Sequence, residues 1–205
     1  MRIEVLRKRL ANLEVAREEL VSVGREISLI SRRVISSVLR KDRANADSAL
    51  SELSRVFQAL VESISRHPEL FYSNLFYSVA AEYVEAIQLY SVVFEGRLKD
   101  LEEIGVHPIP YVLGSIDLIG ELKRASLELL RKEEYVESFK YFEVAERIYE
   151  ELLSIDFADT VIHGFRRKLD VYRKVIDDWR VLLIDIESRV RLEKACREAA
   201  KHSKP

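Results

Sequence analysis

Cysteine is nearly absent from this chain of 205 residues, which contains Cys196 and no other. A single cysteine excludes an internal disulfide, and it excludes the paired cysteines of a zinc finger. The four histidines are isolated, since none stands in a His-x-x-x-His or Glu-x-x-His pattern. Zinc sites and ferritin-like di-iron sites are therefore disfavoured.

Glycine and proline are scarce too, with six and four residues, and long helices contain few of either. No uncharged apolar run approaches the roughly 18 residues of a membrane-spanning helix. The N-terminal segment lacks the apolar run of a signal peptide. Hydrophobic residues nevertheless make up 48% of the chain, enough for one sizeable core. We therefore expect a single cytoplasmic domain over residues 1–205, with no membrane partner.

An excess of positive charge is missing as well, because the net charge is -2. This balance excludes the global basic field that marks many nucleic-acid-binding proteins. The sequence also contains no glycine-rich phosphate loop and no Gly-x-Ser-x-Gly motif. Any contact with a nucleic acid must therefore come from local clusters of charge.

Apolar residues recur at steps of three, four and seven, which is typical of amphipathic helices, and no convincing strand is present. We expect Asn45 or Asp47 to cap the second helix, and residues 154–159 to form a linker before the last one. The sequence thus predicts an all-α fold of seven long helices. Their expected ranges are about residues 2–41, 46–66, 68–96, 97–104, 110–132, 133–153 and 160–200.

Two acids, Glu82 and Glu85, interrupt the apolar face of the third expected helix. Their i,i+3 spacing places both carboxylates about 5–6 Å apart on one side of the helix. An unpaired buried carboxylate is costly, so such acids are usually protonated, paired with a base or bound to a cation. Hard oxygen ligands suit Mg²⁺ or Mn²⁺. On spacing alone, pairing with arginines across a helix interface is the commoner arrangement.

A second acid pair, Asp117 and Glu121, has i,i+4 spacing on the fifth expected helix. A continuous polar stripe in solvent would explain this pair as well. Gly120 lies between the two acids and is a costly residue in a helix interior unless something packs closely against it. The flanking Lys123 and Arg124 could hold a phosphate beside the acids. Four carboxylates on two helices would suit a metal-dependent phosphodiesterase, in which the metal activates water.

Basic residues gather at the end of the first expected helix, where Arg32, Arg33 and Arg40 are interleaved with apolar residues. Arg33 and Arg40 are seven residues apart and share one face of the helix. Such a face could follow a phosphate backbone. Ion pairs with glutamates of neighbouring helices are an equal alternative. The run at residues 166–168 is a similar basic cluster with a weaker claim.

The translin superfamily has a signature helix that resembles residues 111–124, Tyr-Val-Leu-Gly-Ser-Ile-Asp-Leu-Ile-Gly-Glu-Leu-Lys-Arg. The segment Glu82-Tyr-Val-Glu-Ala86 is similar to the matching helix of Trax, the catalytic partner of translin. The basic residues 31–40 resemble the end of the family's first helix. The resemblance covers essentially the whole chain, and it is closest to a compact archaeal-type Trax homologue.

This resemblance implies a seven-helix translin-type bundle of long antiparallel helices that assembles into a hollow octamer. It implies a Mg²⁺-dependent or Mn²⁺-dependent endoribonuclease that cleaves single-stranded RNA inside this shell. The catalytic and metal-binding acids of the family map onto Glu82, Glu85, Asp117 and Glu121. The residues expected to bind single-stranded RNA or DNA are Arg32, Arg33, Arg40, Lys123 and Arg124. Because this chain has no translin partner in view, the resemblance implies a homo-oligomer.

Two other hypotheses stay open at this point. The chain could bind single-stranded nucleic acid without cleaving it, as translin does, because a complete set of acids does not ensure their geometry. It could also be a structural helical oligomer whose acids are neutralised by arginines. The first alternative predicts salt-dependent binding of intact RNA, and the second predicts no RNA binding at moderate salt.

Overall fold

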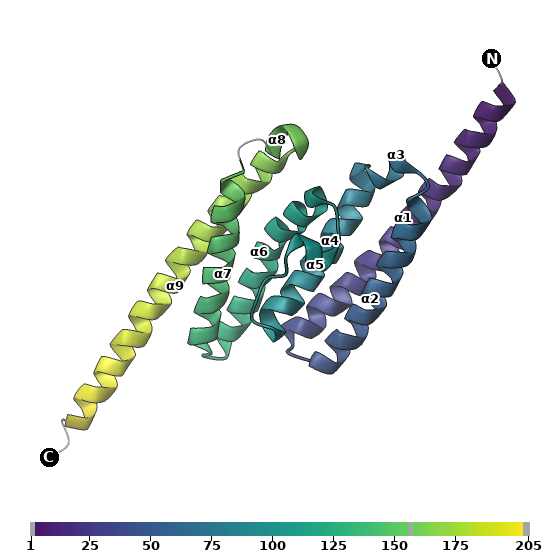
Figure 1. The fold of residues 1–205 in the computed structure, drawn as a ribbon. Helices are drawn as coiled ribbons and strands as arrows, with labels where there is room; N and C mark the ends of the chain where they lie inside the picture. Colours follow the sequence, from purple (N-terminus) through teal and green to yellow (C-terminus); the bar gives the residue numbers. More distant parts are fainter. Residues whose placement is uncertain (1–2, 156–157, 203–205) are drawn as a thin grey trace.

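The computed structural model describes residues 3–155 and 158–202, and helices are the regular structure throughout these ranges (Figure 1). The all-α prediction is confirmed. The long helices are α1 (Ile3–Leu39), α2 (Arg43–Ile64), α4 (Asn74–Phe94), α6 (Pro108–Arg131), α7 (Tyr135–Leu153) and α9 (Phe165–His202). The helices of a single turn are α3 (Pro68–Phe71), α5 (Leu101–Ile104) and α8 (Ala158–Val161).

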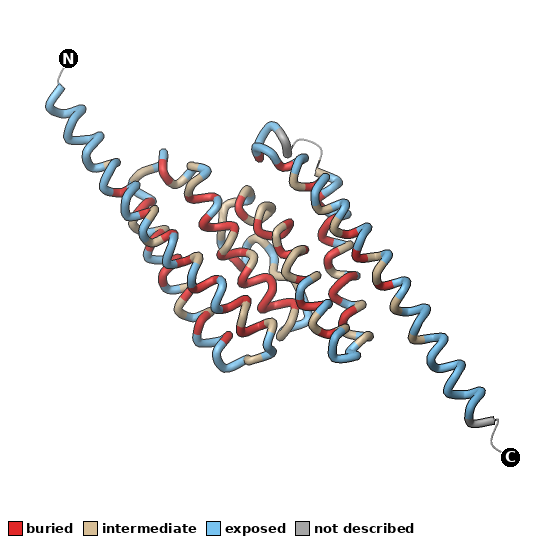
Figure 2. Tube along the Cα trace, turned by 180° about the vertical axis from the view of Figure 1, so that it is seen from behind, coloured by how far each residue is buried: buried red, intermediate tan, exposed pale blue. Residues whose placement is uncertain are grey.

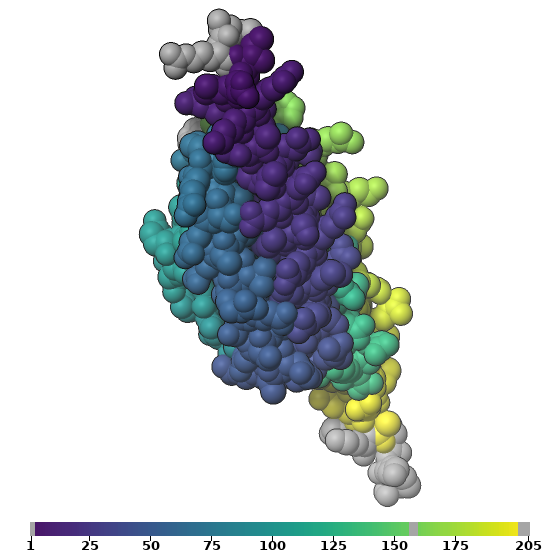
Figure 3. Space-filling view, turned by 90° about the vertical axis from the view of Figure 1, so that its right-hand side faces the viewer, coloured from purple at the N-terminus to yellow at the C-terminus, as the bar shows by residue number. Residues whose placement is uncertain are grey.

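The long helices lie side by side, with α4 and α6 in the middle of the row (Figure 1). On one side α4 packs on α1 and α2, and on the other α6 packs on α7 and α9. The residues of α4 are mostly apolar, and most of them are buried (Figure 2). This composition suits a helix that is covered on several sides. The helices α1 and α2 together cover one face of the molecule (Figure 3).

The predicted helix boundaries need three corrections. The third expected helix is split into α3 and α4, because the hydroxyl of Ser73 accepts a hydrogen bond from the Phe76 backbone N–H at 3.3 Å and starts a new helix. The cap of α2 is Asp42 and not Asn45 or Asp47, since the Asp42 carboxylate accepts the Asn45 N–H. The expected linker, residues 154–159, overlaps the start of α8, and the last long helix begins at Phe165 rather than near residue 160. Residues 156 and 157 of that linker, like the expected first helical residue at position 2, lie outside the described residues.

A buried glutamine organises the connection between α4 and α6. The side chain of Gln88 donates to the backbone carbonyl of Lys99 at 2.8 Å and accepts from its N–H at 2.9 Å. The Tyr111 hydroxyl donates to the same carbonyl at 2.9 Å. The ring of His107 then caps α6 by accepting the Ile109 N–H, so that α6 begins at Pro108, two residues before its expected start. These bonds set the position of α6 against α4.

A glycine lies at the closest approach of α4 and α6. A side-chain carbon added to Gly114 would lie 2.5 Å from the Ala81 carbonyl oxygen and 2.6 Å from Val84 Cβ, which leaves no room for it. Gly120, which the sequence singled out as costly unless something packs closely against it, does not lie at this crossing. A carbon added at Gly120 would make an ordinary contact, 3.6 Å from the Tyr172 hydroxyl. The crossing at Gly114 brings together the helical turns that carry the four predicted acids.

The beginning of α1 and the end of α9 extend beyond the bundle and are exposed to solvent (Figure 2). The first turns of α1 and the last turns of α9 are exposed over nearly their whole length (Figure 2). Apolar side chains are exposed on both projections, at Ile3, Leu6 and Leu10 of α1 and at Ile184 and Leu192 of α9. Within the described ranges, no helix is both long enough and apolar enough to cross a membrane.

Candidate functional site

The two predicted acid pairs meet across the α4–α6 interface. Burial, reinforced by the negative charges of Asp117, Glu121 and Glu82, raises the pKa of Glu85 to about 8. Lys168 opposes this shift with its positive charge. A carboxyl group with a pKa near 8 is short of positive charge around it. The acids thus form one electrostatic cluster, as their placement on two packed helices predicted.

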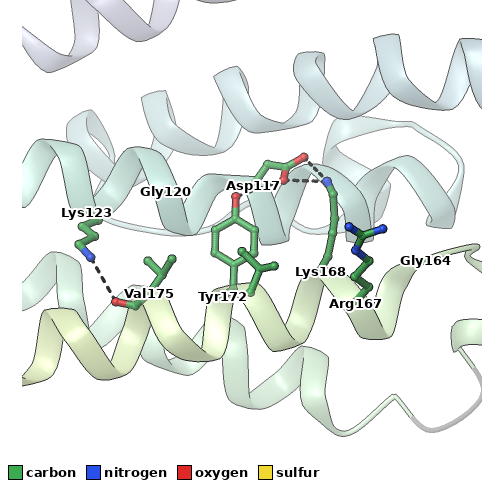
Figure 4. A pocket seen from close by; sticks show the side chains of 9 residues that line it. Asp117, Gly120, Lys123, Gly164, Arg167, Lys168, Tyr172 and Val175 are labelled. Atoms are coloured by element: carbon green, nitrogen blue, oxygen red, sulfur yellow. Dashed lines mark hydrogen bonds and ion pairs between the residues drawn. The ribbon is translucent and has the colours of Figure 1, made fainter.

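The carboxylate of Asp117 is held by two side chains from α9. The ammonium of Lys168 lies 2.7 Å from Oδ1 and 2.6 Å from Oδ2 (Figure 4). The hydroxyl of Tyr172, one helical turn further along α9, donates to Oδ1 at 3.2 Å. Burial and the charge of Asp117 raise the pKa of this tyrosine, so it stays a neutral donor. Asp117 is therefore fully hydrogen-bonded.

The carboxylate of Glu121 is less well satisfied. Its Oε2 atom is buried and has no hydrogen-bond partner. The nearest cation is the guanidinium of Arg124, whose Nη1 lies 3.6 Å away, at ion-pair distance but too far for a good hydrogen bond. Burial raises the pKa of Glu121, and Arg124 opposes the rise. A buried acceptor without a donor is unusual in a folded protein, and it leaves this oxygen available to a ligand.

A pocket of about 520 Å³ opens beside Asp117, between α6 and the start of α9 (Figure 4). Its charged lining residues are Asp117, Lys123, Arg167 and Lys168, so cations outnumber acids there. The side chain of Lys123 donates to the Val175 carbonyl at 3.3 Å at one end of the pocket. The pocket is large enough for a phosphate group with part of its nucleoside.

The donor set suits a hard divalent cation by chemistry and by charge. The four predicted ligands are carboxylates, burial and then the charges of three neighbouring acids raise the pKa of Glu85, and the buried Oε2 of Glu121 has no hydrogen-bond partner. As the side chains stand, the described residues contain no group of three or more His, Cys, Asp or Glu that could hold a metal ion. Two of the four acids are paired with cations instead, Asp117 with Lys168 and Glu121 with Arg124.

Two basic pockets adjoin the end of α1 and share Arg40 and Ser36. The larger, of about 530 Å³, lies between α1 and α6 and is lined by Arg40, Arg124, Arg131 and Lys132, with Glu128 as its acid. The smaller, of about 360 Å³, lies between α1 and α2 and contains Arg33 and Arg40 among small polar residues. Arg40 follows the C-terminus of α1, where the helix dipole favours a cation.

The five predicted nucleic-acid-binding residues fall in different places. Arg40 and Arg124 share the larger basic pocket, and Lys123 lines the pocket beside Asp117. Arg33 lines the smaller basic pocket, but its guanidinium also pairs with Glu52 at 3.0 and 3.3 Å, as the ion-pair alternative expected. Arg32 is exposed and lines none of these pockets.

One stripe of α6 connects the acids with the larger basic pocket. Its residues follow steps of four and three, which keeps them on one face of the helix. The stripe comprises Asp117, Glu121, Arg124, Glu128 and Arg131. Arg124 belongs to both sites, because it pairs with Glu121 and lines the pocket that contains Arg40. A strand of phosphates held in the basic pocket would therefore run next to the acids.

Sequence reasoning missed two residues of the acid site and two of the basic pocket. Lys168 belongs to the basic run 166–168, which was considered only as a weak candidate for phosphate binding, and no sequence pattern indicated Tyr172. They are more than 50 positions from Asp117, and only the packing of α9 on α6 brings them there. Arg131 and Lys132 could have been found by continuing the α6 stripe one turn beyond Glu128.

The fold and the site define an all-α protein in which the packed helices α4 and α6 carry four carboxylates whose charges act on Glu85, beside cationic pockets. A sequence model described as the Translin family matches residues 15–178, and the chain belongs to this family. One relative is "Uncharacterized protein MJ0175" of Methanocaldococcus jannaschii, 30% identical over 170 residues, or 82% of this chain and 75% of the relative.

Solved structures of the same type superpose on most of the chain. AfC3PO has a TM-score of 0.82 and 32% identity over 92% of this chain and 98% of that one. The AfC3PO–duplex RNA complex has a TM-score of 0.81 and 31% identity over the same shares. The crystal structure of apo-NeC3PO has a TM-score of 0.80 and 29% identity, covering 89% of this chain and 96% of that chain. The translin-type fold expected from the sequence is confirmed.

Proposed function

We propose that this protein is a Trax-like endoribonuclease that cleaves single-stranded RNA with the help of Mg²⁺ or Mn²⁺. The observation that carries the proposal is the continuous charged stripe of α6. Arg124 links the acid cluster to the larger basic pocket, so RNA held by its phosphates would lie against the acids. Binding and cleavage sites that share one helix favour an enzyme over a protein that only binds.

In this proposal Glu82, Glu85, Asp117 and Glu121 hold the cation. When bound, the cation activates water and neutralises charge at phosphorus. The pKa of Glu85 is raised to about 8, so this residue is suited to accept a proton near neutral pH. Tyr172 orients the Asp117 carboxylate by its hydrogen bond to Oδ1. Burial of Glu121 between α4 and α6 keeps water away from its inner oxygen.

RNA binding is assigned to the two basic pockets that share Arg40, and to Lys123 in the pocket beside Asp117. A relative of known structure, AfC3PO, was solved in complex with duplex RNA, which supports RNA as the ligand class. The preference for a single strand is our proposal for this chain. Competition between a labelled single strand and the matching duplex measures it directly.

We also propose that the chain forms a hollow homo-oligomer, an octamer by its resemblance to the family. The exposed apolar residues on the projecting ends of α1 and α9 support assembly, since apolar groups on bare helix are normally covered. Light scattering coupled to size-exclusion chromatography gives the number of chains. A monomer at micromolar concentration would contradict this part of the proposal.

A protein that binds RNA without cutting it is the second candidate, and one observation favours it. Lys168 already neutralises Asp117, and the acids are not gathered into a metal site as they stand. This candidate predicts salt-dependent binding of RNA that stays intact through long incubation with Mg²⁺.

Cleavage of an end-labelled single-stranded RNA separates the two candidates. The assay compares Mg²⁺, Mn²⁺ and EDTA, and compares the wild type with Glu85→Gln, which removes the charge and keeps the shape. Glu62→Gln is the matched control, because Glu62 is an exposed glutamate of α2 outside the site. We expect cleavage only with a divalent cation and only when Glu85 is intact. Cleavage that survives both EDTA and Glu85→Gln would overturn the mechanism.

A further inference from the structure

The ammonium of Lys168 occupies the position in which a cation on Asp117 would be expected. It lies within 2.7 Å of both carboxylate oxygens, so it engages both of them. A Mg²⁺ ion binds carboxylate oxygens at about 2.0–2.1 Å, close enough to exclude an ammonium from the same oxygens. Lys168 and a divalent cation therefore compete for Asp117.

The backbone beneath Lys168 is fixed while its side chain is free to move. Buried apolar residues of α9, among them Phe165, Leu169 and Ile176, pack this helix against the bundle. The side chain of Lys168 is nevertheless 40% exposed, and it lies at the edge of the pocket of about 520 Å³. A long lysine side chain can leave Asp117 and enter this pocket without any movement of α9.

The charge of the pocket depends on where Lys168 points. Asp117 is the acid among its lining residues, and it balances one of three cations, Lys123, Arg167 and Lys168. Once a divalent cation takes Asp117, all three positive charges face the pocket with no acid among its lining residues to balance them. Such a pocket attracts a phosphate diester, whose oxygens accept charge-assisted hydrogen bonds from lysine and arginine.

We propose that Lys168 holds the place of the metal on Asp117, and that an arriving divalent cation displaces it into the pocket, where it binds a phosphate of the RNA. This inference rests on the proposed function and assigns Lys168 as a positioning residue that couples the two ligands. Cation and RNA then strengthen each other's binding, as linkage requires. Without a cation, Lys168 stays paired with Asp117, and only Lys123 and Arg167 are left unbalanced by an acid among the lining residues of the pocket.

The first part of the proposal is that a divalent cation and Lys168 compete for Asp117. The affinity for Mn²⁺, measured from the free-ion EPR signal, tests this part and requires no catalysis. The probes are the wild type, Lys168→Gln, and Lys168→Met, which keeps the alkyl chain. We expect both variants to bind Mn²⁺ about tenfold more tightly than the wild type, because the competing ammonium is gone. Arg167→Gln is the matched control. It removes a positive charge from the same pocket but no contact with Asp117, so its Mn²⁺ affinity should change much less.

The second part of the proposal is that the displaced Lys168 binds a phosphate of the RNA. A 2′-O-methyl oligoribonucleotide, which resists cleavage, tests this part. We expect it to tighten Mn²⁺ binding to the wild type and to do so much less in Lys168→Gln. Circular dichroism verifies that each variant remains helical. Mn²⁺ affinity that is unchanged or weaker in both Lys168 variants would overturn the inference and leave the proposed metal site in place. No Mn²⁺ binding by any of the proteins would overturn the proposed metal site and the inference with it. Coupling to the oligonucleotide that persists in Lys168→Gln would overturn the second part.

Discussion

Glu85 of α4 and Asp117 of α6 lie close enough across the helix interface for the charge of one to raise the pKa of the other. They belong to helices that meet at Gly114, one turn before Asp117, where no side chain would fit. A glycine thus allows two helices to approach until their acids interact. The same proximity makes the charged form of Glu85 destabilising, and the loss in free energy of unfolding can be measured.

Glu85→Gln is expected to stabilise the protein while abolishing RNA cleavage. The pKa of Glu85 rises from 4.5 to about 8, so folding favours its protonated form. The free energy of unfolding should therefore fall as pH rises from about 4.5 to 8, and level off above that. The full shift would correspond to about 5 kcal/mol, at roughly 1.4 kcal/mol per pH unit. We expect a difference of about 1–3 kcal/mol, because the side chain is partly exposed.

Urea unfolding of the wild type and Glu85→Gln at several pH values, without divalent cations, measures this effect. The two curves should converge near pH 5 and separate by pH 8. Equal free energies of unfolding for the wild type and Glu85→Gln at pH 8 would show that the charge of Glu85 does not destabilise the fold.

Alanine at two glycines of α6 should act in opposite directions. Gly114→Ala forces a methyl group into the Ala81 carbonyl and Val84, so we expect a loss of about 1–3 kcal/mol. Gly120→Ala adds a methyl at ordinary contact distance from Tyr172, and alanine favours a helix by about 1 kcal/mol over glycine. Its stability should stay equal or rise. Thermal unfolding of both variants measures the two changes in stability. A Gly120→Ala variant that is less stable than the wild type would contradict the assignment of the closest helix contact to Gly114.

Arg40→Ala should weaken RNA binding without a preference for sequence. Arg40 lines both basic pockets, and in the proposed function its guanidinium contacts the phosphates of the RNA. Loss of one phosphate contact should reduce the slope of log affinity against log salt by about 1. Fluorescence anisotropy with a labelled RNA at several salt concentrations measures it. Arg147→Ala on the outer part of α7 is the control and should leave the slope unchanged. Equal slopes for the two variants would remove Arg40 from the RNA site.

Gln88→Leu should cost about 1–3 kcal/mol, because the half-buried backbone N–H of Lys99 loses its partner while the Lys99 carbonyl keeps only the Tyr111 hydroxyl. The loss should appear in urea unfolding, and hydrogen exchange should rise between α4 and α6. Gln58→Leu is the matched control, since Gln58 is exposed on α2. A neutral Gln88→Leu would mean that the connection holds its position by packing alone.

The sequence predicted what depends on local spacing. The i,i+3 pair on α4 was visible as an interruption of an apolar face, the i,i+4 pair on α6 was visible within a polar stripe, and the scarcity of glycine and proline indicated long helices. The contacts that depend on tertiary packing were not visible. Nothing in the sequence near Asp117 indicates that Lys168 and Tyr172 will reach it from α9.

Two further features could not be predicted because they also depend on tertiary packing. Both Gly114 and Gly120 interrupt a helix, and only the position of α4 shows which of them needs to lack a side chain. Arg33 and Arg40 share a helix face, but Glu52 of α2 engages one and leaves the other for the pockets. Spacing identified the correct groups, and the packing of the helices determined the partner of each.

A crystal structure of the protein soaked with Mn²⁺ tests the central claim most directly. Anomalous scattering locates the ion without any assumption about activity. We predict a peak between α4 and α6, coordinated by Asp117 and Glu85, with the Lys168 ammonium moved away from Asp117. A structure at saturating Mn²⁺ that shows no peak there, with Lys168 still on Asp117, would contradict the account.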